Sequence, residues 1–252
     1  MRPPADAVVK TPEALARLSE EIVHCRRCPR LVRYRERLAV LGAEKDGSSY
    51  WGKPVPGFGD PEASVLIVGL APAARGANRT GRIFTGDRSA EFLSAALYRA
   101  GFANQPFSVA REDGLEYHRA YLTAAVRCVP PDNRPTTTEA DRCLPFLVRE
   151  IRALPALRVV LGLGKLAWDR SFQAASEAFG VSLRRAPFAH GARLPLGTGL
   201  PVLWGTYHPS PRNTQTGLLS AEMFDRELTA IRTYVDDAIR GLDSRSRATS
   251  RS

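Results

Sequence analysis

One stretch, residues 65–87 (VLIVGLAPAARGANRTGRIFTGD), constrains the fold of this 252-residue chain more than any other. Its first four residues form a continuous apolar run, which is typical of a strand buried on both faces of a parallel sheet. A loop rich in glycine and small residues follows. In open parallel sheets, ligands bind in the crevice at the carboxyl ends of the strands. The stretch therefore predicts a central strand that leads directly into a binding site.

Further elements surround this strand. Three more apolar runs, at residues 121–126, 158–162 and 201–206, are expected to be strands. Apolar periodicity and capping residues predict helices at 12–22, 90–100, 163–179 and 221–239, and one capped by 136–138. Prolines and glycines predict irregular segments at 42–59 and 130–135. Alternating strands and helices predict a three-layer α/β/α sandwich with a central, mostly parallel four-stranded sheet.

The domain organisation expected is a single domain over residues 12–239. Residues 1–11 are rich in proline and residues 240–252 in serine and arginine, and we expect both ends to be disordered. No run of 18 apolar residues occurs, and the first residues lack the apolar core of a signal peptide. We therefore expect a cytoplasmic protein.

The chain is basic, with a formal net charge of +10. Residues 240–252 hold four arginines and one aspartate, 4 − 1 = +3, which leaves +7 on the body. A basic surface concentrates phosphate-bearing ligands, so this charge favours a polyanionic partner. It is also compatible with a protein that is merely basic and soluble.

Four cysteines, Cys25, Cys28, Cys128 and Cys143, form the first chemical pattern. A reducing compartment disfavours disulfides, so metal binding is the leading interpretation. Four thiolates can hold zinc or a four-iron cluster. The wide second pair, Pro29 after Cys28 and the neighbouring arginines favour iron and sulfur over a zinc ribbon, which uses two tight pairs.

The second pattern joins the loop of residues 69–87 to TYHPSPRNTQTG at residues 206–217. If both lie at the carboxyl edge of one sheet, His208 faces a pocket lined by Ala71, Pro72, Asn78 and Phe84. His208 stands between a strand end and Pro209, a position from which residues act on ligands. Glycines on both sides of Phe84 indicate a ring at a loop surface, where it can stack on a base.

The chain resembles the type-b, or family 5, uracil-DNA glycosylases of bacteria and archaea. The resemblance rests on GLAPAARGANRTGRIFTGD, YLTAAVRC and YHPSPRNTQTG together with the cysteines. It spans about residues 25–224. It implies the glycosylase α/β/α fold, a [4Fe-4S] cluster on the four cysteines, and excision of uracil and other deaminated or oxidised bases from DNA.

The resemblance also gives the residues roles. An enzyme that cuts the bond between sugar and base must extrude the nucleotide, so it needs a basic groove, a pocket and a wedge. Phe84 would stack on the base, and His208 would donate a hydrogen bond to the pyrimidine O2 as negative charge develops. The pocket would also include Gly69, Leu70, Ala71 and Ala124. The expected minor-groove insert contains Ser210, Arg212, Asn213, Thr214 and Gln215.

The sequence departs from related patterns at two positions. The first motif offers no carboxylate in LAPA at residues 70–73, and Ala124 stands where sister families carry an asparagine that reads uracil. An apolar wall discriminates less well than a hydrogen-bonding reader, so we expect a broad substrate range that includes hypoxanthine and xanthine. Asn78 is the residue expected to hold the attacking water, with Asp87 as the alternative, which also suits a helix cap. These motifs contain no lysine, which predicts base removal without strand cleavage.

Other classes of protein stay open on the sequence alone. An electron-transfer protein, or an iron–sulfur DNA-binding protein without glycosylase activity, would use the same cysteines. A nucleobase deaminase needs H-x-E with P-C-x-x-C, and neither motif occurs. We expect a monomer associated with the nucleoid that acts on DNA containing deaminated bases. The sequence does not tell whether a sliding clamp is a partner.

Overall fold

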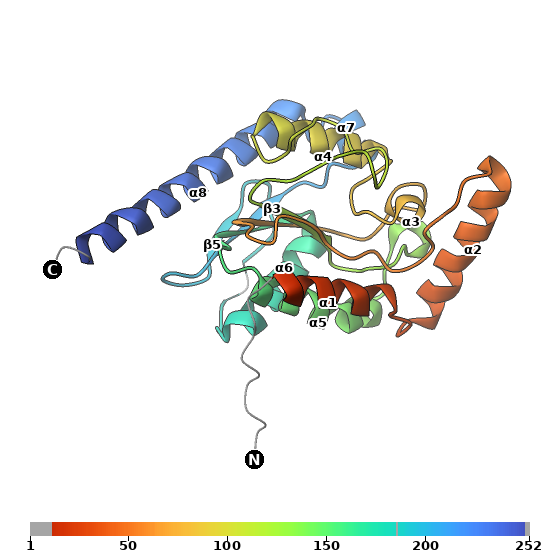
Figure 1. Cartoon of the computed structure of the whole chain (residues 1–252), viewed down its shortest axis with the longest axis horizontal. Helices are drawn as coiled ribbons and strands as arrows, with labels where there is room; N and C mark the ends of the chain where they lie inside the picture. The colour runs from red at the N-terminus through yellow and green to blue at the C-terminus, as the bar shows by residue number, and fades with distance from the viewer. Residues whose placement is uncertain (1–11, 185, 250–252) are drawn as a thin grey trace, which may run out of the picture.

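The centre of the molecule is a parallel sheet built from the four predicted apolar runs (Figure 1). The computed structural model describes residues 12–184 and 186–249, with the backbone alone at 46 and 242–249. Strands β3 (Ala120–Ala124), β2 (Val65–Gly69), β4 (Val159–Leu163) and β6 (Val202–Thr206) lie side by side in this order and pair in parallel. Every residue of these strands is buried. The mostly parallel sheet expected from the sequence is therefore confirmed.

The sheet has two short edge strands that the sequence analysis missed. Strand β1 (Phe58–Gly59) pairs antiparallel with β3, and β5 (Arg193–Pro195) pairs antiparallel with β6. The sheet is thus six-stranded and mixed, in the order β1-β3-β2-β4-β6-β5, instead of four-stranded. Both edge strands are too short to show an alternating apolar pattern, and this explains why they were missed.

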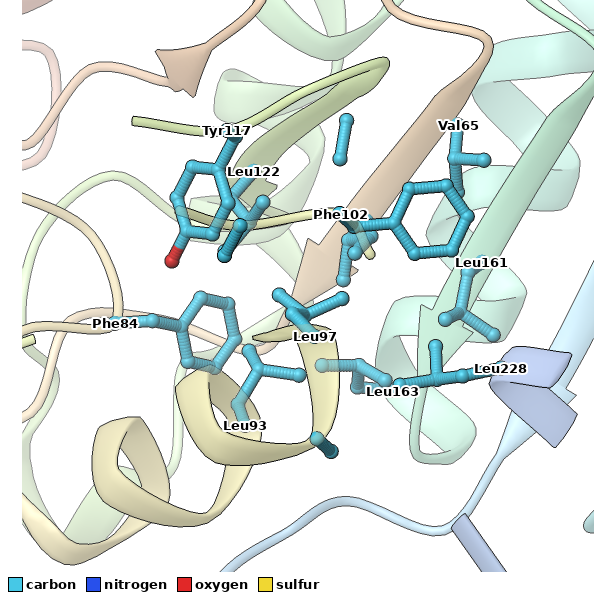
Figure 2. Packing of buried hydrophobic residues seen from close by; sticks show 14 of the residues in the cluster. Val65, Phe84, Leu93, Leu97, Phe102, Tyr117, Leu122, Leu161, Leu163 and Leu228 are labelled. Carbon is cyan, nitrogen blue, oxygen red and sulfur yellow. The ribbon is translucent and has the colours of Figure 1, made fainter. Parts of the chain in front are cut away.

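Helices α4 (Arg88–Arg99) and α8 (Ala221–Thr249) cover one face of the sheet. Alternate strand residues such as Val65, Leu122 and Leu161 pack there against Leu93, Leu97 and Leu228 from the helices, as Figure 2 shows. The aromatic ring of Phe84 belongs to the same apolar cluster. This core therefore connects the glycine-rich loop to the sheet.

The opposite face is covered by α1 (Pro12–Val23), α5 (Thr137–Ala153) and α6 (Lys165–Phe179), which lie below the sheet in Figure 1. The other set of strand residues, including Leu66, Val160 and Leu203, packs against these helices. Thr136 caps α5 as predicted, in a capping box with Glu139. The helices on two faces make the expected three-layer sandwich.

Several short or polar elements differ from the sequence expectation. Helix α2 (Pro29–Asp46) reaches into the segment predicted to be irregular, and α3 (Ala77–Thr80) and α7 (Pro211–Gln215) form within predicted loops. A 3-10 turn occupies Pro131–Asn133. Helix α8 continues beyond residue 239 to Thr249, into the predicted tail.

Residues 1–11 and 250–252, which the sequence predicts to be disordered, lie outside the described part of the chain. The helices within the described residues are all too short or too polar to cross a lipid bilayer.

Candidate active site at the carboxyl edge of the sheet

The four parallel strands end side by side at one edge of the sheet. Gly69 pairs with Ala124, and Leu163 pairs with Thr206. A cavity of about 780 Å³ opens beyond these ends. Of the predicted site residues, Leu70, Ala71, His208, Ser210, Arg212 and Asn213 line this cavity. The glycine-rich loop and the segment after β6 therefore line one cavity. This follows from the parallel sheet, in which the loops after the strands begin at the same edge.

His208 enters this cavity directly after β6. Its backbone carbonyl accepts hydrogen bonds from the side chain of Asn213 and from the amide of Ser210, both at 2.8 Å. Burial lowers the pKa of His208 to about 4, since the surroundings disfavour the charged imidazolium. The imidazole is therefore neutral at neutral pH, with one ring nitrogen as a hydrogen-bond donor.

Phe84 lies close to His208, although it comes from a different part of the chain. The two ring centroids are 6.4 Å apart and the planes are inclined by 34°. Phe84 is buried, with 8% of its surface exposed, and it is not among the residues that line the 780 Å³ cavity. Its backbone has φ 48°, a left-handed conformation that is unusual for a bulky residue.

Gly69 explains how the Phe84 ring reaches this position. A Cβ atom on Gly69 would lie 2.5 Å from Cζ of Phe84, so only glycine lets the ring lie over the end of β2. Gly69 and Ala124 are buried and do not line the cavity themselves. These two predicted pocket residues lie at the ends of β2 and β3.

Asn78 and Asp87, the two candidates for holding water, have different surroundings. Asn78 is buried in α3 and does not line the cavity, and within the part of the chain that the structure describes neither Oδ1 nor Nδ2 of its side chain has a hydrogen-bond partner. Asp87 lines the cavity, and its Oδ1 accepts a hydrogen bond of 3.0 Å from the Ala90 amide at the start of α4. Burial raises the pKa of Asp87 above its ordinary value. Asp87 is thus a helix cap and a cavity residue at the same time.

The predicted minor-groove insert is a short helix. Ser210 precedes α7, whose first residue is Pro211. The Asn213 side chain binds the His208 carbonyl, and the Thr214 hydroxyl donates to the Ser210 carbonyl. Arg212 and Gln215 are exposed. The segment therefore separates into residues that hold its shape and residues that are free to reach a ligand.

Other residues line the cavity that the sequence analysis did not single out. They include Asp132, Asn133 and Arg134 in the loop after β3, Lys165 at the start of α6, and the aromatic residues Phe188 and Tyr207. The loop after β3 could have been recognised, because it follows a strand at the same edge as Gly69. Nothing in the sequence around Phe188 indicates its place in the cavity.

The cysteines gather beside the active-site edge. Cys28, Cys128 and Cys143 are buried in one cluster with Leu31, Val126 and Ala140, and Cys25 is partly buried. Nη1 of Arg35, which is buried, donates to Sγ of Cys128 at 3.0 Å. Burial is the main reason that the pKa of Cys128 is raised to about 12; Arg35 opposes the rise, and the neighbouring Cys143 and Cys25 contribute to it. The four thiols are therefore close enough to influence one another.

Within the described residues, no three side chains of His, Cys, Asp or Glu are arranged to hold a single metal ion. Four grouped thiols with a guanidinium beside one sulfur are a donor set that an anionic iron–sulfur cluster can use, as can a tetrahedral zinc ion. The residues present thus fit an iron–sulfur cluster by their chemistry.

Comparison with known proteins completes the description of the site. The model of the uracil DNA glycosylase superfamily matches residues 56–232. The type-5 uracil-DNA glycosylase of Thermus thermophilus is 46% identical over 205 residues, which cover 81% of this chain and 91% of that protein. The type-5 enzyme of Pyrobaculum aerophilum is 47% identical over 201 residues, covering 80% and 84%. The type-4 uracil-DNA glycosylase of the same organism is 34% identical over 151 residues, covering 59% and 61%.

Proposed function

The chain belongs to the uracil-DNA glycosylase superfamily and is similar to its type-5 members, and from this premise we propose that it hydrolyses the N-glycosidic bond of uracil in DNA and leaves an abasic site. The observation that carries the proposal is the approach of Phe84 to His208, with ring centroids 6.4 Å apart beside a cavity at the strand ends. A planar base between or beside these rings would have an aromatic face and a hydrogen-bond donor available to it.

The surface around the cavity supports binding of DNA. Four cationic side chains, Arg88, Arg134, Lys165 and Arg212, line the cavity together with polar loop residues. Cationic groups position the phosphate backbone without reading sequence. We infer that the damaged nucleotide is extruded from the stack into the cavity, because the glycosidic bond is inaccessible inside a duplex. Such a substrate would also place the enzyme at the nucleoid.

His208 would act on the departing base as a neutral donor. Negative charge develops on the pyrimidine oxygens as the glycosidic bond breaks, and a fixed N–H donor stabilises that charge. A neutral imidazole is available at neutral pH because burial lowers the pKa of His208 to about 4. Asn213 supports this geometry through its hydrogen bond to the His208 carbonyl.

Asp87 is better placed than Asn78 to orient the attacking water. Asp87 lines the cavity and Asn78 does not, although the Asn78 side chain, which has no hydrogen-bond partner among the described residues, could also bind water. One Asp87 oxygen caps α4, which fixes the direction of the carboxylate. We therefore prefer Asp87 for this role and retain Asn78 as the alternative to be tested.

A broad substrate range follows from the apolar part of the site. Leu70, Ala71 and Phe188 line the cavity, and the small Ala124 ends the neighbouring strand. Apolar walls reject a wrong base only weakly. We propose that the enzyme also removes hypoxanthine and xanthine.

Base removal is proposed to occur without strand cleavage, although one lysine lines the cavity. Nζ of Lys165 lies 2.7 Å from Oδ2 of Asp169 and is largely exposed. A lysine side chain held by a neighbouring carboxylate is not free to attack the sugar as an amine nucleophile. Borohydride trapping of a protein–DNA adduct would contradict this proposal, and the adduct should then disappear in Lys165→Gln.

For the cofactor, we propose a [4Fe-4S] cluster held by Cys25, Cys28, Cys128 and Cys143, with zinc as the less favoured alternative. The cluster would join the α1–α2 connection to the loop after β3 and to α5, so its contribution would be structural.

A duplex oligonucleotide with one uracil tests the proposed function. The protein should convert it to an alkali-labile product that is not cleaved before alkali treatment, and oligonucleotides with hypoxanthine or xanthine should also react. The variant Phe84→Ala combined with His208→Asn is the matched inactive control. DNA binding or a dithionite-bleachable colour with no excision at enzyme excess would instead favour an iron–sulfur DNA-binding or electron-transfer protein.

A further inference from the structure

A buried ion pair lies next to Phe84 in the chain. Nη2 of Arg82 is 2.8 Å from Oδ2 of Asp113, and the two side chains are only 3% and 6% exposed. The same guanidinium donates to Oγ1 of Thr85 at 2.8 Å, to Oγ of Ser108 at 3.0 Å and to the carbonyl of Arg111 at 3.0 Å. A buried charge of this kind is costly unless its hydrogen bonds are satisfied, as they are here. Arg82 therefore joins the glycine-rich loop to residues 108–113.

Asp113 organises the segment on the other side of this pair. Its Oδ2 also accepts from the amides of Val109 and Ala110, at 2.8 and 3.2 Å, and its Oδ1 accepts from the amide of Leu115 at 3.0 Å. These bonds close the loop between α4 and β3 into a fixed turn. Residues 108–115 are thus a rigid support for the Arg82 guanidinium.

A second set of hydrogen bonds joins the residues just after Phe84 to Ser108. The hydroxyls of Thr85 and Ser108 lie 2.8 Å apart, and the amide of Gly86 donates to the Ser108 carbonyl at 2.8 Å. Thr85 is fully buried. Phe84 therefore stands between two anchored positions, Arg82 and Thr85, that are both held by the same loop.

This attachment explains how Phe84 keeps its unfavourable backbone. A left-handed φ of 48° is strained for an aromatic residue and persists only where the surroundings enforce it. The enforced conformation lays the ring over Gly69 and brings it to 6.4 Å from His208. Without the attachment, relaxation of residues 82–85 would turn the ring away from that position.

We propose that Arg82 and Asp113 are positioning residues, which hold Phe84 in its strained conformation so that its ring meets the extruded base. Arg82 and Asp113 do not line the cavity, and their bonds reach the site through the chain on either side of Phe84, whose ring lies 6.4 Å from that of the cavity residue His208. The proposal rests on the proposed function, because it assumes that the Phe84 ring contacts the base.

The test compares Arg82→Met, Phe84→Leu and the double variant by single-turnover excision of uracil and by binding of a non-cleavable duplex. Arg82→Met should lower the excision rate about tenfold, and the double variant should be no slower than Phe84→Leu within about twofold. Binding of the duplex should change by less than about twofold, because the phosphate contacts remain. Arg99→Met is the matched control: it removes a guanidinium from a pair with Asp225 at 2.8 Å that is exposed and joins α4 to α8.

Different results overturn different statements. If the wild-type protein does not excise uracil, the proposed function fails. The positioning role fails if the wild type is active and Arg82→Met is equally fast. It also fails if the double variant is slowed by the product of the two single rate losses, those of Arg82→Met and Phe84→Leu. Should Arg82→Met not fold, Arg82→Lys replaces it in the same comparison, since that variant keeps a positive charge opposite Asp113 but cannot reproduce the bonds of the guanidinium to Thr85, Ser108 and Arg111.

Discussion

At the scale of single residues, the environment of His208 determines both its chemistry and its contribution to stability. Burial lowers its pKa from 6.5 to about 4, so the folded protein keeps the imidazole neutral over a range in which a free histidine takes up a proton. The neutral form still donates one hydrogen bond. A charged imidazolium is therefore not needed to explain how a departing base would be stabilised.

The first prediction concerns His208→Asn. The shorter asparagine side chain holds its N–H donor away from the position of the imidazole N–H, so uracil excision should slow by about 100-fold. Between pH 6.5 and 4 the unfolded chain binds a proton at His208 that the folded protein does not bind, so wild-type stability should fall as the pH falls through this window. The loss in free energy of unfolding that is attributable to His208 should reach at most about 3 kcal/mol, and it should be absent in His208→Asn. Denaturant unfolding of the wild type and of His208→Asn between pH 6.5 and 4 measures this loss. If the free energies of unfolding of the two proteins fall in parallel with pH, the prediction is contradicted.

The second prediction separates the two roles of Asp87. Ser is also a good helix cap, so Asp87→Ser should keep the start of α4 within about 0.5 kcal/mol of wild-type stability but should remove the carboxylate from the cavity. Excision should then slow at least about tenfold without a matching loss of stability. Chemical unfolding and single-turnover kinetics measure the two effects.

Asn78→Leu is the matched comparison for this prediction. It removes a buried side-chain amide that has no hydrogen-bond partner among the described residues, and a change of this kind is near neutral or stabilising. Excision should persist if Asp87 orients the water. An inactive Asn78→Leu with an active Asp87→Ser would reverse the assignment.

At the scale of elements, a buried ion pair fixes the exit of β3 against α5. Nη2 of Arg127 is 2.6 Å from Oε2 of Glu150, and both side chains are 1% exposed. Thr123 on β3 donates to the other Glu150 oxygen at 3.1 Å. Arg127 immediately precedes Cys128, so this pair sets where the loop of the third cysteine begins.

The third prediction follows from this pair. Glu150→Gln leaves the Arg127 charge buried without an anion, which should lower the free energy of unfolding by about 3–5 kcal/mol. Asp237→Asn removes an exposed partner of Arg240 and should change the free energy of unfolding by less than about 1 kcal/mol. Denaturant unfolding of the two variants checks the difference, and equal effects would contradict it.

The elements also show what a single sequence can predict. The four parallel strands were predictable because each is a short, fully apolar run, and their order of appearance with helices between them fixed the fold class. Strands β1 and β5 gain their structure only by pairing with β3 and β6, a tertiary effect that two or three residues cannot display. Helix α2 was missed because its many charged residues and Gly42 hide its apolar face.

The same reasoning applies to the candidate site. His208 and the glycine-rich loop were predictable from the rule that parallel strands end at one edge. Phe188 and Asn133 were not singled out, because their place in the cavity depends on how their loops fold back over it. The partnership of Arg82 with Asp113 spans 31 positions and has no local signature.

At the scale of the whole molecule, the four cysteines connect parts of the chain that the sheet does not hold directly. Cys25 and Cys28 lie between α1 and α2, Cys128 follows β3, and Cys143 is in α5. Helix α1 has its own apolar attachment, since Leu15, Leu18 and Ile22 are buried. Helix α2 has fewer buried apolar residues, namely Leu31 and Val32, and it carries Arg35, which donates to Cys128.

This distribution gives the last prediction, which concerns removal of the proposed cluster. If the cluster joins these segments, its removal should expose the amides of α2 and of residues 128–136 to hydrogen exchange, with a smaller effect on α1. Strands β2 and β4 should stay protected, because their apolar contacts with α4, α6 and α8 do not involve the cysteines. Hydrogen exchange of the iron-containing protein, the chelated protein and Cys25→Ser makes the comparison. Loss of protection throughout the sheet, or no loss in α2, would show that the cysteines do not stabilise the fold in this way.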